Sequence, residues 1–474
     1  MRLANFIGGK FCPPIGGSYF DDIEPATAER IAEVPDSDER DVDAAVRAAR
    51  KAFASWSRTP IADRSRLLLR LADLIEQNGE ELAQLESRDS GKAISLARKL
   101  DIPRAVANFR FFGTAILHFA SEAHVTDATA LNYTLRQPIG VAGLISPWNL
   151  PLYLLSWKIA PAIAAGNTCI AKPSELTPLT ANRLAELSIE AGIPAGVINI
   201  VHGYGQKAGR ALTAHDDVPV ISFTGGTVTG AAIAANAAPR FKKLSLELGG
   251  KNPNLIFADA DLDDAIATSI RSSFWNQGEI CLCGSRIFVE RSIYGQFVER
   301  FVAATKKLRV GDPSDETTDV GALISEAHVA KVTGYIELAR QEGGKVVTGG
   351  KRVDRRGFFV EPTVITGLSC DCRVLQEEIF GPVVTITPFD REDEAIAFAN
   401  STRYGLSATL WTRDLQRAHR VAAAIDSGTV WINCWLLRDL RVPFGGMKES
   451  GVGREGGFES LNFFTESKNV CVKL

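Results

Sequence analysis

Segments with helical and with strand-like spacing of apolar residues alternate through most of the chain. Residues 41–56 and 62–85 repeat apolar side chains every three or four positions, which predicts two helices. From residue 138 onward, short apolar runs are separated by further helical segments. The predicted strands are 138–146, 167–171, 197–201 and 218–223, and the predicted helices are 154–165, 180–191 and 205–214. This order is typical of a doubly wound α/β nucleotide-binding sheet.

A second α/β unit is predicted after Gly250. It begins with a strand at 254–257 and a helix at 262–274, and the alternation runs to about residue 430. The tail alternates apolar and polar residues at 469–473, which predicts an edge strand that needs a partner.

Composition narrows the classes of function. The chain has 474 residues, more than one hydrophobic core usually holds, so we expect two or three domains. Its 53 basic and 56 acidic side chains give a net charge of −3, which argues against a nucleic-acid partner. The most apolar stretch, 153–171, is interrupted by polar residues and a proline, and no signal-peptide core is present, so we expect a cytoplasmic protein with no membrane partner. The spacing of 8 Cys and 6 His residues matches no metal motif, and no metal is predicted.

Two features after predicted strands could bind a nucleotide. The glycine clusters at 203–208 and 225–230 either present backbone N–H groups to a pyrophosphate or are simple strand-to-helix turns. Glu175, close to Lys172, could accept hydrogen bonds from ribose hydroxyls and would repel a 2′-phosphate, which favours NAD over NADP. The alternative for this pair is a solvated loop.

Three further segments could carry catalysis. A polar, glycine-flanked stretch holds Cys281 and Cys283, and the residues alone do not decide between a nucleophilic and a structural thiol, or between the two cysteines. Glu247 lies in an apolar run, where it could be a general base with a raised pKa or a partner in a salt bridge. Asn149 lies between two prolines and could be a rigid oxyanion donor or part of a packing turn.

Taken together, these segments resemble the aldehyde dehydrogenase superfamily over nearly the whole chain. Seven motifs in the family's order carry the resemblance: Pro147-Trp148-Asn149-Leu150-Pro151, Lys172-Pro-Ser-Glu175, Phe223-Thr-Gly-Gly-Thr227, Leu246-Glu247-Leu-Gly-Gly-Lys251, Gly278-Glu-Ile-Cys281, Glu377-Glu378-Ile-Phe380-Gly-Pro382 and Pro443-Phe-Gly-Gly446.

The resemblance implies roles for individual residues. Cys281 matches the nucleophile, Glu247 the general base, and Asn149 the oxyanion donor beside the Cys281 backbone N–H. The resemblance implies NAD as the cofactor, and the residues that match the family's NAD-binding site are Ser146, Trp148, Lys172, Glu175, Phe223, Gly225, Gly226, Leu248, Glu378 and Phe380. The chain departs from the usual family pattern at Gly226 and at Glu279, and Glu279 could be a second base.

The resemblance also implies a division of the chain. It predicts a Rossmann-type NAD-binding domain at 1–116 and 137–247, an α/β catalytic domain at 248–437, and a β oligomerisation element at 117–136 and 458–474. A homodimer or homotetramer is expected, in which the C-terminal strand finds its partner.

Within the family, the chain is most similar to the muconic semialdehyde dehydrogenases. Arg104 and Arg438 are expected to clamp the carboxylate of a 2-aminomuconic or 2-hydroxymuconic semialdehyde, because guanidinium pairs with carboxylate in a bidentate way. The alternative for each arginine is a surface salt bridge. Alternative functions are a broad aliphatic or betaine-type aldehyde dehydrogenase and a non-catalytic protein of the same fold.

Overall fold

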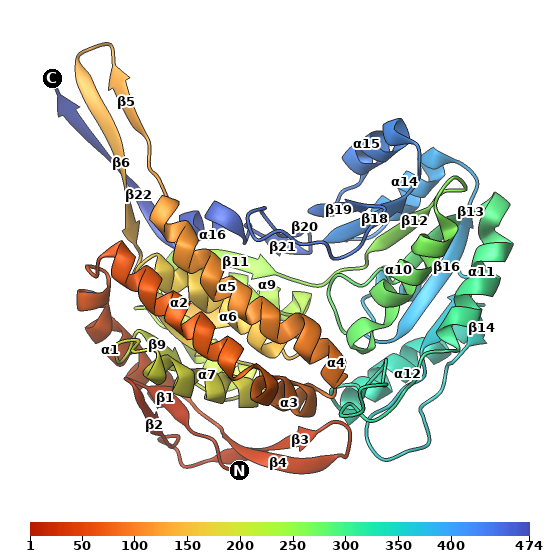
Figure 1. Cartoon of the computed structure of the whole chain (residues 1–474), viewed down its shortest axis with the longest axis horizontal. Coiled ribbons are helices and arrows are strands. Elements are labelled where there is room, and N and C mark those ends of the chain that lie inside the picture. The colour runs from red at the N-terminus through yellow and green to blue at the C-terminus, as the bar shows by residue number, and fades with distance from the viewer.

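An eight-stranded sheet forms the centre of the first lobe in the computed structural model, which describes all 474 residues (Figure 1). Its five central strands are parallel and follow the doubly wound order in which the first strand in sequence lies in the middle. Across the sheet the strands are β2 (Lys10–Cys12), β1 (Asn5–Ile7), β9 (Ile198–Ile200), β8 (Thr168–Lys172), β7 (Val141–Ile145), β10 (Val220–Thr224), β11 (Lys243–Glu247) and β21 (Gly451–Val452). The predicted nucleotide-binding sheet is therefore confirmed.

Helices cover this sheet. They are α1 (Glu39–Trp56), α2 (Ile61–Gln77), α3 (Gly79–Ser90), α4 (Ile94–Leu96), α5 (Ile102–Ala115), α6 (Pro151–Ala164), α7 (Leu179–Glu190), α8 (Arg210–Ala214) and α9 (Thr227–Ala237). Helix α1 begins with a capping box between Asp38 and Asp41, and its apolar stripe is buried. In the whole chain, no helix has the length and apolarity that a membrane span requires.

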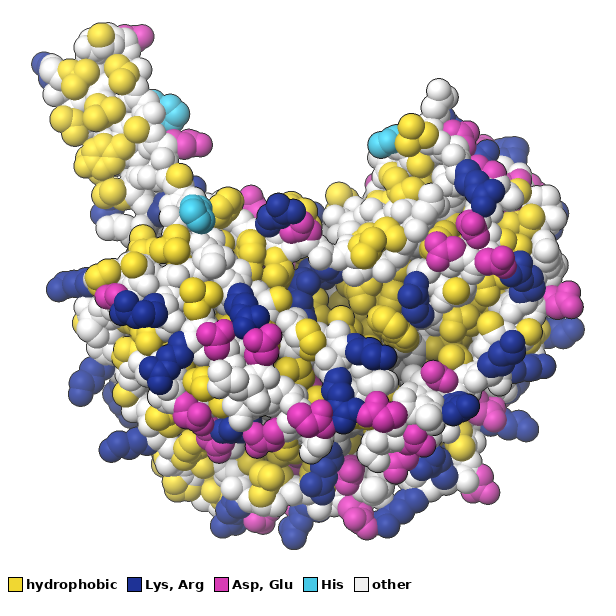
Figure 2. Space-filling model, viewed as in Figure 1, with side chains coloured by type: hydrophobic (Ala, Val, Ile, Leu, Met, Phe, Trp, Pro, Cys, Tyr) yellow, Lys and Arg dark blue, Asp and Glu magenta, His cyan; other side chains and the backbone are white.

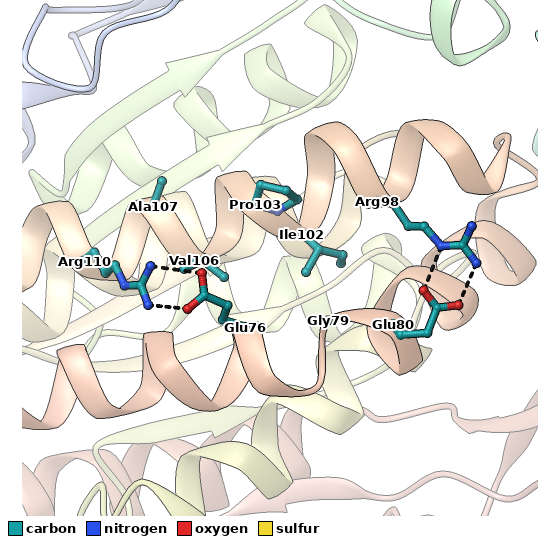
Figure 3. Close-up of a pocket in the computed structure, with 9 residues that line it drawn as sticks. All are labelled: Glu76, Gly79, Glu80, Arg98, Ile102, Pro103, Val106, Ala107 and Arg110. Atoms are coloured by element: carbon teal, nitrogen blue, oxygen red, sulfur yellow. Dashed lines mark hydrogen bonds and ion pairs between the residues drawn. The ribbon is translucent and has the colours of Figure 1, made fainter.

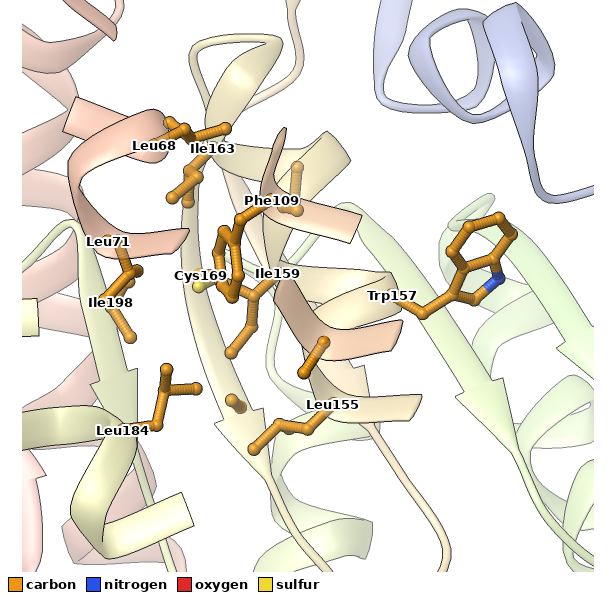
Figure 4. Close-up of a cluster of buried hydrophobic side chains, with 14 of the residues drawn as sticks. Leu68, Leu71, Phe109, Leu155, Trp157, Ile159, Ile163, Cys169, Leu184 and Ile198 are labelled. Carbon is orange, nitrogen blue, oxygen red and sulfur yellow. The ribbon is translucent and has the colours of Figure 1, made fainter. Parts of the chain in front are cut away.

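The largest core lies between the sheet and the helices α2, α5, α6 and α7. Figure 4 shows part of it, with Leu68, Phe109 and Ile159 packed against the strand residues Cys169 and Ile198. All five side chains are at most 1% exposed, so this layer is a rigid base for the loops at the strand ends.

The single helix predicted at 62–85 is instead two helices, α2 and α3. Asn78 ends α2 and precedes α3, with a backbone conformation outside the helical region. Its side-chain amide donates to the Leu74 carbonyl oxygen at 2.8 Å. Because Asn and Gly favour such breaks, the Asn78-Gly79 pair ends the first helix although the apolar periodicity continues beyond it.

A seven-stranded sheet forms the second lobe, and all its strand pairs are parallel except the β14 and β15 pair. In order it contains β14 (Lys345–Thr348), β15 (Thr363–Thr366), β16 (Val383–Phe389), β13 (Arg286–Glu290), β12 (Pro253–Ile256), β18 (Ser407–Trp411) and β19 (Thr429–Ile432). The remaining helices are α10 (Leu262–Phe274), α11 (Arg291–Thr305), α12 (Glu326–Gln341), α13 (Arg373–Gln376), α14 (Glu392–Asn400), α15 (Leu415–Ala424) and α16 (Gly457–Phe463). Two further sheets have two strands each: β3 (Tyr19–Glu24) pairs with β4 (Glu29–Pro35), and β17 (Tyr404–Gly405) pairs with β20 (Met447–Lys448).

A three-stranded arm projects from the first lobe (Figure 1). It pairs β22 (Thr465–Lys473) with β6 (Ala130–Pro138) and β5 (Ala123–Thr126), so the tail strand has a partner within its own chain on one edge. Apolar side chains lie exposed on the arm, and Val125 and Val472 are 67% and 45% exposed (Figure 2). The exact domain boundaries, at 1–116 and 137–247, 248–437, and 117–136 and 458–474, stay a prediction.

Candidate active site

The ends of several strands surround one cavity of about 260 Å³. Loops after β7, β10 and β11 reach it from the first lobe, at the carboxyl edge where doubly wound sheets bind ligands. Eight of the predicted site residues line it: Trp148, Asn149, Gly225, Gly226, Leu248, Cys281, Glu378 and Phe380. The cavity is thus a meeting point of segments far apart in the sequence.

An unusual turn brings the nucleophile candidate to this cavity. After α10, three successive residues, Asn276, Gln277 and Gly278, have left-handed backbone conformations with φ of 51°, 56° and 72°. Gly278 lies so close to the Gly381 backbone that a Cβ would come within 2.3 Å of the Gly381 oxygen. Such strained backbone is typical of functional sites, and here it comes shortly before Cys281, which lines the cavity.

The structure distinguishes the two cysteines of this segment. Cys281 is half-buried and lines the cavity, whereas Cys283 is 7% exposed and packs in an apolar cluster with Trp431 and Phe444. The Asn252 amide donates to the backbone oxygens of Cys281 and Cys283, at 2.7 and 2.8 Å, which fixes this loop. The geometry therefore favours Cys281 as the nucleophile.

The protein alone does not lower the pKa of this thiol. Burial raises the pKa of Cys281 to about 12, and the Glu378 and Glu247 carboxylates add to the rise, whereas the Arg438 guanidinium opposes it. A reactive thiolate at neutral pH therefore needs a positive charge or a proton acceptor brought next to the sulfur.

Asn149 is held rigidly in a buried position, 3% exposed. Its side-chain Nδ2 donates to the Glu279 backbone oxygen at 2.9 Å, across the boundary between the lobes. Its own backbone oxygen accepts from Lys92 Nζ at 2.9 Å and from Asn276 Nδ2 at 3.0 Å. An amide nitrogen has two hydrogens, so one remains for an oxyanion in the cavity.

Glu247 ends β11 with a carboxylate that is buried and has no hydrogen-bond partner on either oxygen. Burial raises its pKa well above the ordinary value, and nearby Glu455 adds to the rise, while Lys158, Arg438 and Arg454 oppose it. A free carboxylate with a raised pKa is suited to accepting a proton near neutral pH. A Cβ at Gly445 would lie 2.8 Å from Oε1 of Glu247, so glycine leaves this carboxylate its space.

The first lobe also holds groups that fit a dinucleotide. Lys172 Nζ and Glu175 Oε2 lie 2.8 Å apart at the end of β8. Burial alone would raise the pKa of Glu175, but the Lys172 ammonium holds it below the ordinary value, so this carboxylate is ionised and available to ribose hydroxyls.

Several polar groups of the first lobe lack hydrogen-bond partners. The hydroxyls of Ser146, Thr224 and Thr227 are buried without hydrogen-bond partners, which is costly unless a ligand supplies them. Gly226 precedes the eleven-residue helix α9, and a Cβ there would meet nothing within 4 Å, so a phosphate could approach the helix N-terminus. These residues fit a bound NAD.

Glu378 and Phe380 come from the second lobe. Glu378 Oε1 accepts from the Gly250 backbone N–H at 2.8 Å, and the Phe380 ring packs edge-on to Trp148 with centroids 5.3 Å apart. Sequence reasoning missed two neighbours on α12, His328 and Lys331, which also line the cavity. They are three positions apart near the start of a helix, and no motif marks them in the sequence.

Several other residues singled out in the sequence do not line this cavity: Arg104, Ser146, Lys172, Glu175, Phe223, Glu247, Glu279 and Arg438. Phe223 is 4% exposed, and its ring lies against Gly225, so it supports the glycine turn from beneath. The oxygens of the Glu279 carboxylate already have partners: they accept from the Ile324 N–H at 3.2 Å and from Gln277 Nε2 at 3.3 Å, and Oε1 lies 3.5 Å from Nε2 of the cavity-lining His328. This placement favours Glu247 over Glu279 as the base.

Arg104 and Arg438 meet around the ring of Trp157, at 5.5 and 6.0 Å from its centroid. No carboxylate lies within 4.0 Å of either guanidinium, and two nitrogens of Arg104 are buried without partners. Asp439, which could have neutralised them, is instead paired with Arg441 at 2.6 Å. Neither guanidinium has an acidic partner, and the Arg438 charge is close enough to oppose the rise in the pKa of both Cys281 and Glu247.

A larger cavity of about 500 Å³ lies elsewhere, between α2, α3 and α5 (Figure 3). Its arginines are occupied, since Arg110 binds Glu76 at 2.5 Å and Arg98 binds Glu80 at 2.7 Å. The charged side chains that line this cavity are paired with one another, and none of the predicted site residues lines it.

Comparison with known proteins agrees with this geometry. The model of the aldehyde dehydrogenase family matches residues 13–470. The chain is 57% identical to the 2-aminomuconic semialdehyde dehydrogenase of Danio rerio, over 100% of this chain and 98% of that protein. It is 48% identical to the 2-hydroxymuconic semialdehyde dehydrogenase of Pseudomonas sp. (strain CF600), over 100% of both chains. The solved NAD⁺ complex of an aldehyde dehydrogenase from Bacillus cereus superposes with a TM-score of 0.99 at 43% identity, covering 100% of this chain and 97% of that one. The chain belongs to the aldehyde dehydrogenase family.

Proposed function

We propose that this enzyme oxidises 2-aminomuconic or 2-hydroxymuconic 6-semialdehyde to the corresponding dicarboxylic acid with NAD as the cofactor. The observation that carries the substrate class is the pair Arg104 and Arg438, two guanidinium groups without acidic partners that share the Trp157 ring, of which Arg438 acts electrostatically on Cys281 and Glu247. The names of the relatives in Danio rerio and Pseudomonas support the same substrates. In a broad aliphatic or betaine-type enzyme, the two arginines would have only a structural role, through their packing on Trp157.

The proposed chemistry begins at the Cys281 sulfur. Its thiolate attacks the aldehyde carbon, a C–S bond forms, and the carbonyl oxygen becomes an oxyanion. Asn149 Nδ2 and the Cys281 backbone N–H, which donates to no other backbone group, stabilise that oxygen. NAD, when bound, supplies a positively charged ring and the acceptor for the hydride that leaves the substrate carbon.

The thioester left on Cys281 is then hydrolysed. Glu247 takes a proton from water, the resulting hydroxide adds to the thioester carbon, and the C–S bond breaks to release the acid and the thiolate. The unpaired, buried Glu247 carboxylate is suited to this role because its raised pKa makes it a stronger base than an exposed carboxylate. Two carboxylates are proposed to hold the two ribose rings of NAD. They are Glu378, which accepts a hydrogen bond from the Gly250 N–H, and Glu175, which accepts one from Lys172 Nζ.

We also propose that the working enzyme is a cytoplasmic homodimer or homotetramer. The arm of β5, β6 and β22 projects away from the lobe and exposes Val125, Val472 and Leu474, which a second copy could cover (Figure 2). All eight cysteines are free, which supports a reducing compartment.

Replacing Arg438 with alanine tests the substrate class. We expect KM for 2-hydroxymuconic semialdehyde to rise about 10-fold to 150-fold, the effect of losing about 1.5–3 kcal/mol from hydrogen bonds to a charged group. A neutral aldehyde of similar length should change far less, because it has no carboxylate to lose. Arg441→Ala is the matched control on the same loop, since Arg441 is exposed and paired with Asp439. Equal changes for both aldehydes would refute the clamp.

A further inference from the structure

Lys92 is a fully buried lysine that the proposed reaction does not use. It follows α3, and its side chain is 0% exposed. Its ammonium donates to Asp101 Oδ2 at 2.8 Å and to the Asn149 backbone oxygen at 2.9 Å, and Glu86 Oε1 lies 3.8 Å away. None of Lys92, Asp101 and Glu86 lines the cavity of Cys281.

The Lys92 and Glu86 members of this buried cluster hold the segment of Asn149 at two points. Lys92 binds the Asn149 backbone oxygen, and the Glu86 carboxylate accepts from the Leu152 backbone N–H at 3.3 and 3.4 Å. Because Pro151 begins α6 between these two contacts and its ring fixes φ, few conformations of Asn149 remain compatible with both. The ion cluster thus sets the backbone from which the Asn149 side chain projects.

A second set of contacts extends this arrangement to the nucleophile. Asn276 Nδ2 donates both to the Asn149 oxygen at 3.0 Å and to the Glu279 oxygen at 3.1 Å, and Asn149 Nδ2 donates to that same Glu279 oxygen. The Ala322 N–H also donates to the oxygen of Gly91, next to Lys92, at 2.9 Å. Lys92 therefore lies where the loop of Asn149 and the segment of Cys281 are held together.

Stability alone is a poor reason for this cluster. Removing an ammonium and two carboxylates from water is costly, and well-packed apolar residues often replace such groups without loss of stability. A directed bond to one backbone oxygen, in contrast, is something that an apolar side chain cannot provide.

We propose that Lys92 is a positioning residue, whose ammonium fixes the backbone of Asn149 so that the Asn149 amide faces the oxyanion. This inference rests on the proposed function, because it needs Asn149 to be the oxyanion donor. Lys92 itself touches neither substrate nor cofactor and acts only through Asn149.

A double-mutant cycle on the full-length enzyme tests the proposal. Asn149→Ala should lower kcat about 100-fold to 1,000-fold, the usual effect of a lost oxyanion donor. Lys92→Met should lower kcat at least about tenfold in the native background, yet change it less than about twofold when Asn149 is already alanine. Equal factors in the two backgrounds would overturn the role of Lys92. A normal kcat for Asn149→Ala would instead refute the proposed oxyanion donor.

Alkylation of Cys281 by iodoacetamide supplies a second readout. This displacement forms no oxyanion, so Lys92→Met should leave its rate unchanged, whereas general damage to the site would slow alkylation and oxidation together and overturn the proposal. Arg64→Met is the matched control, since Arg64 is another buried cation that binds backbone oxygens, those of Ala164 and Thr59, but far from the cavity. It should lose stability without losing kcat. If Lys92→Met does not fold, Lys92→Met with Glu86→Gln and Asp101→Asn replaces it in the same cycle.

Discussion

Alanine in place of Cys281 is expected to reduce NADH production by a factor of at least about 10⁴, because Cys281 is the only thiol that lines the cavity and the thioester route requires it. The measurement is the absorbance of NADH under saturating aldehyde and NAD. In the native enzyme, we expect the rate at which iodoacetamide labels Cys281 to change when NAD is added. In this variant, that NAD-dependent labelling should be absent.

Cys283→Ala is the matched control for this prediction. Cys283 lies two residues away, but it belongs to the buried apolar cluster that contains Trp431 and Phe444, and it does not line the cavity. We expect it to keep its kcat and to lose about 1 kcal/mol of stability from the small cavity created. Activity that survives in Cys281→Ala and falls in Cys283→Ala would reverse the assignment made from the structure.

Glutamine in place of Glu247 is expected to block the second half of the reaction. The thiohemiacetal can still be oxidised, so mixing enzyme, NAD and aldehyde should give a burst of about one NADH per active site, after which turnover falls about 10²-fold to 10⁴-fold without its general base. Rapid mixing with detection of NADH absorbance measures both phases. Glu279→Gln is the matched control and should keep normal turnover, since its carboxylate points to Ile324 and Gln277.

The pH dependence should follow the same residue. Glu247 acts as a base only when deprotonated, and its pKa is raised, so kcat is expected to fall with decreasing pH at values above the ordinary glutamate pKa of about 4.3. This acid limb should be absent in Glu247→Gln. A normal steady state without a burst in that variant would contradict its role as the deacylation base.

The sequence was sufficient to predict the doubly wound sheet, because its strands are short apolar runs between helices with regular spacing. It also singled out Asn149, Glu247 and Cys281, of which Asn149 and Cys281 line the cavity, and the catalytic roles of all three stay predictions. Composition could not choose between Cys281 and Cys283, since only the three left-handed residues at 276–278 decide which thiol reaches the cavity. The contacts of Lys92 were out of reach for a similar reason: they join segments 57 residues apart, and no local pattern encodes them.

His328 and Lys331 illustrate the same limit. Their helix has ordinary amphipathic spacing, and only the packing of the second lobe against the first turns its N-terminal end toward Trp148 and Phe380. The apolar pattern does not show the break between α2 and α3, because the periodicity continues across Asn78 whereas the helical backbone stops there.

The central claim is that a carboxylate on the aldehyde is recognised during NAD-dependent oxidation. It is tested most directly by kcat/KM for 2-hydroxymuconic semialdehyde and for a neutral aldehyde of similar length, each measured with NAD and with NADP. The account predicts a strong preference for the acidic aldehyde and for NAD. Comparable values for the two aldehydes, or a preference for the neutral one, would contradict it.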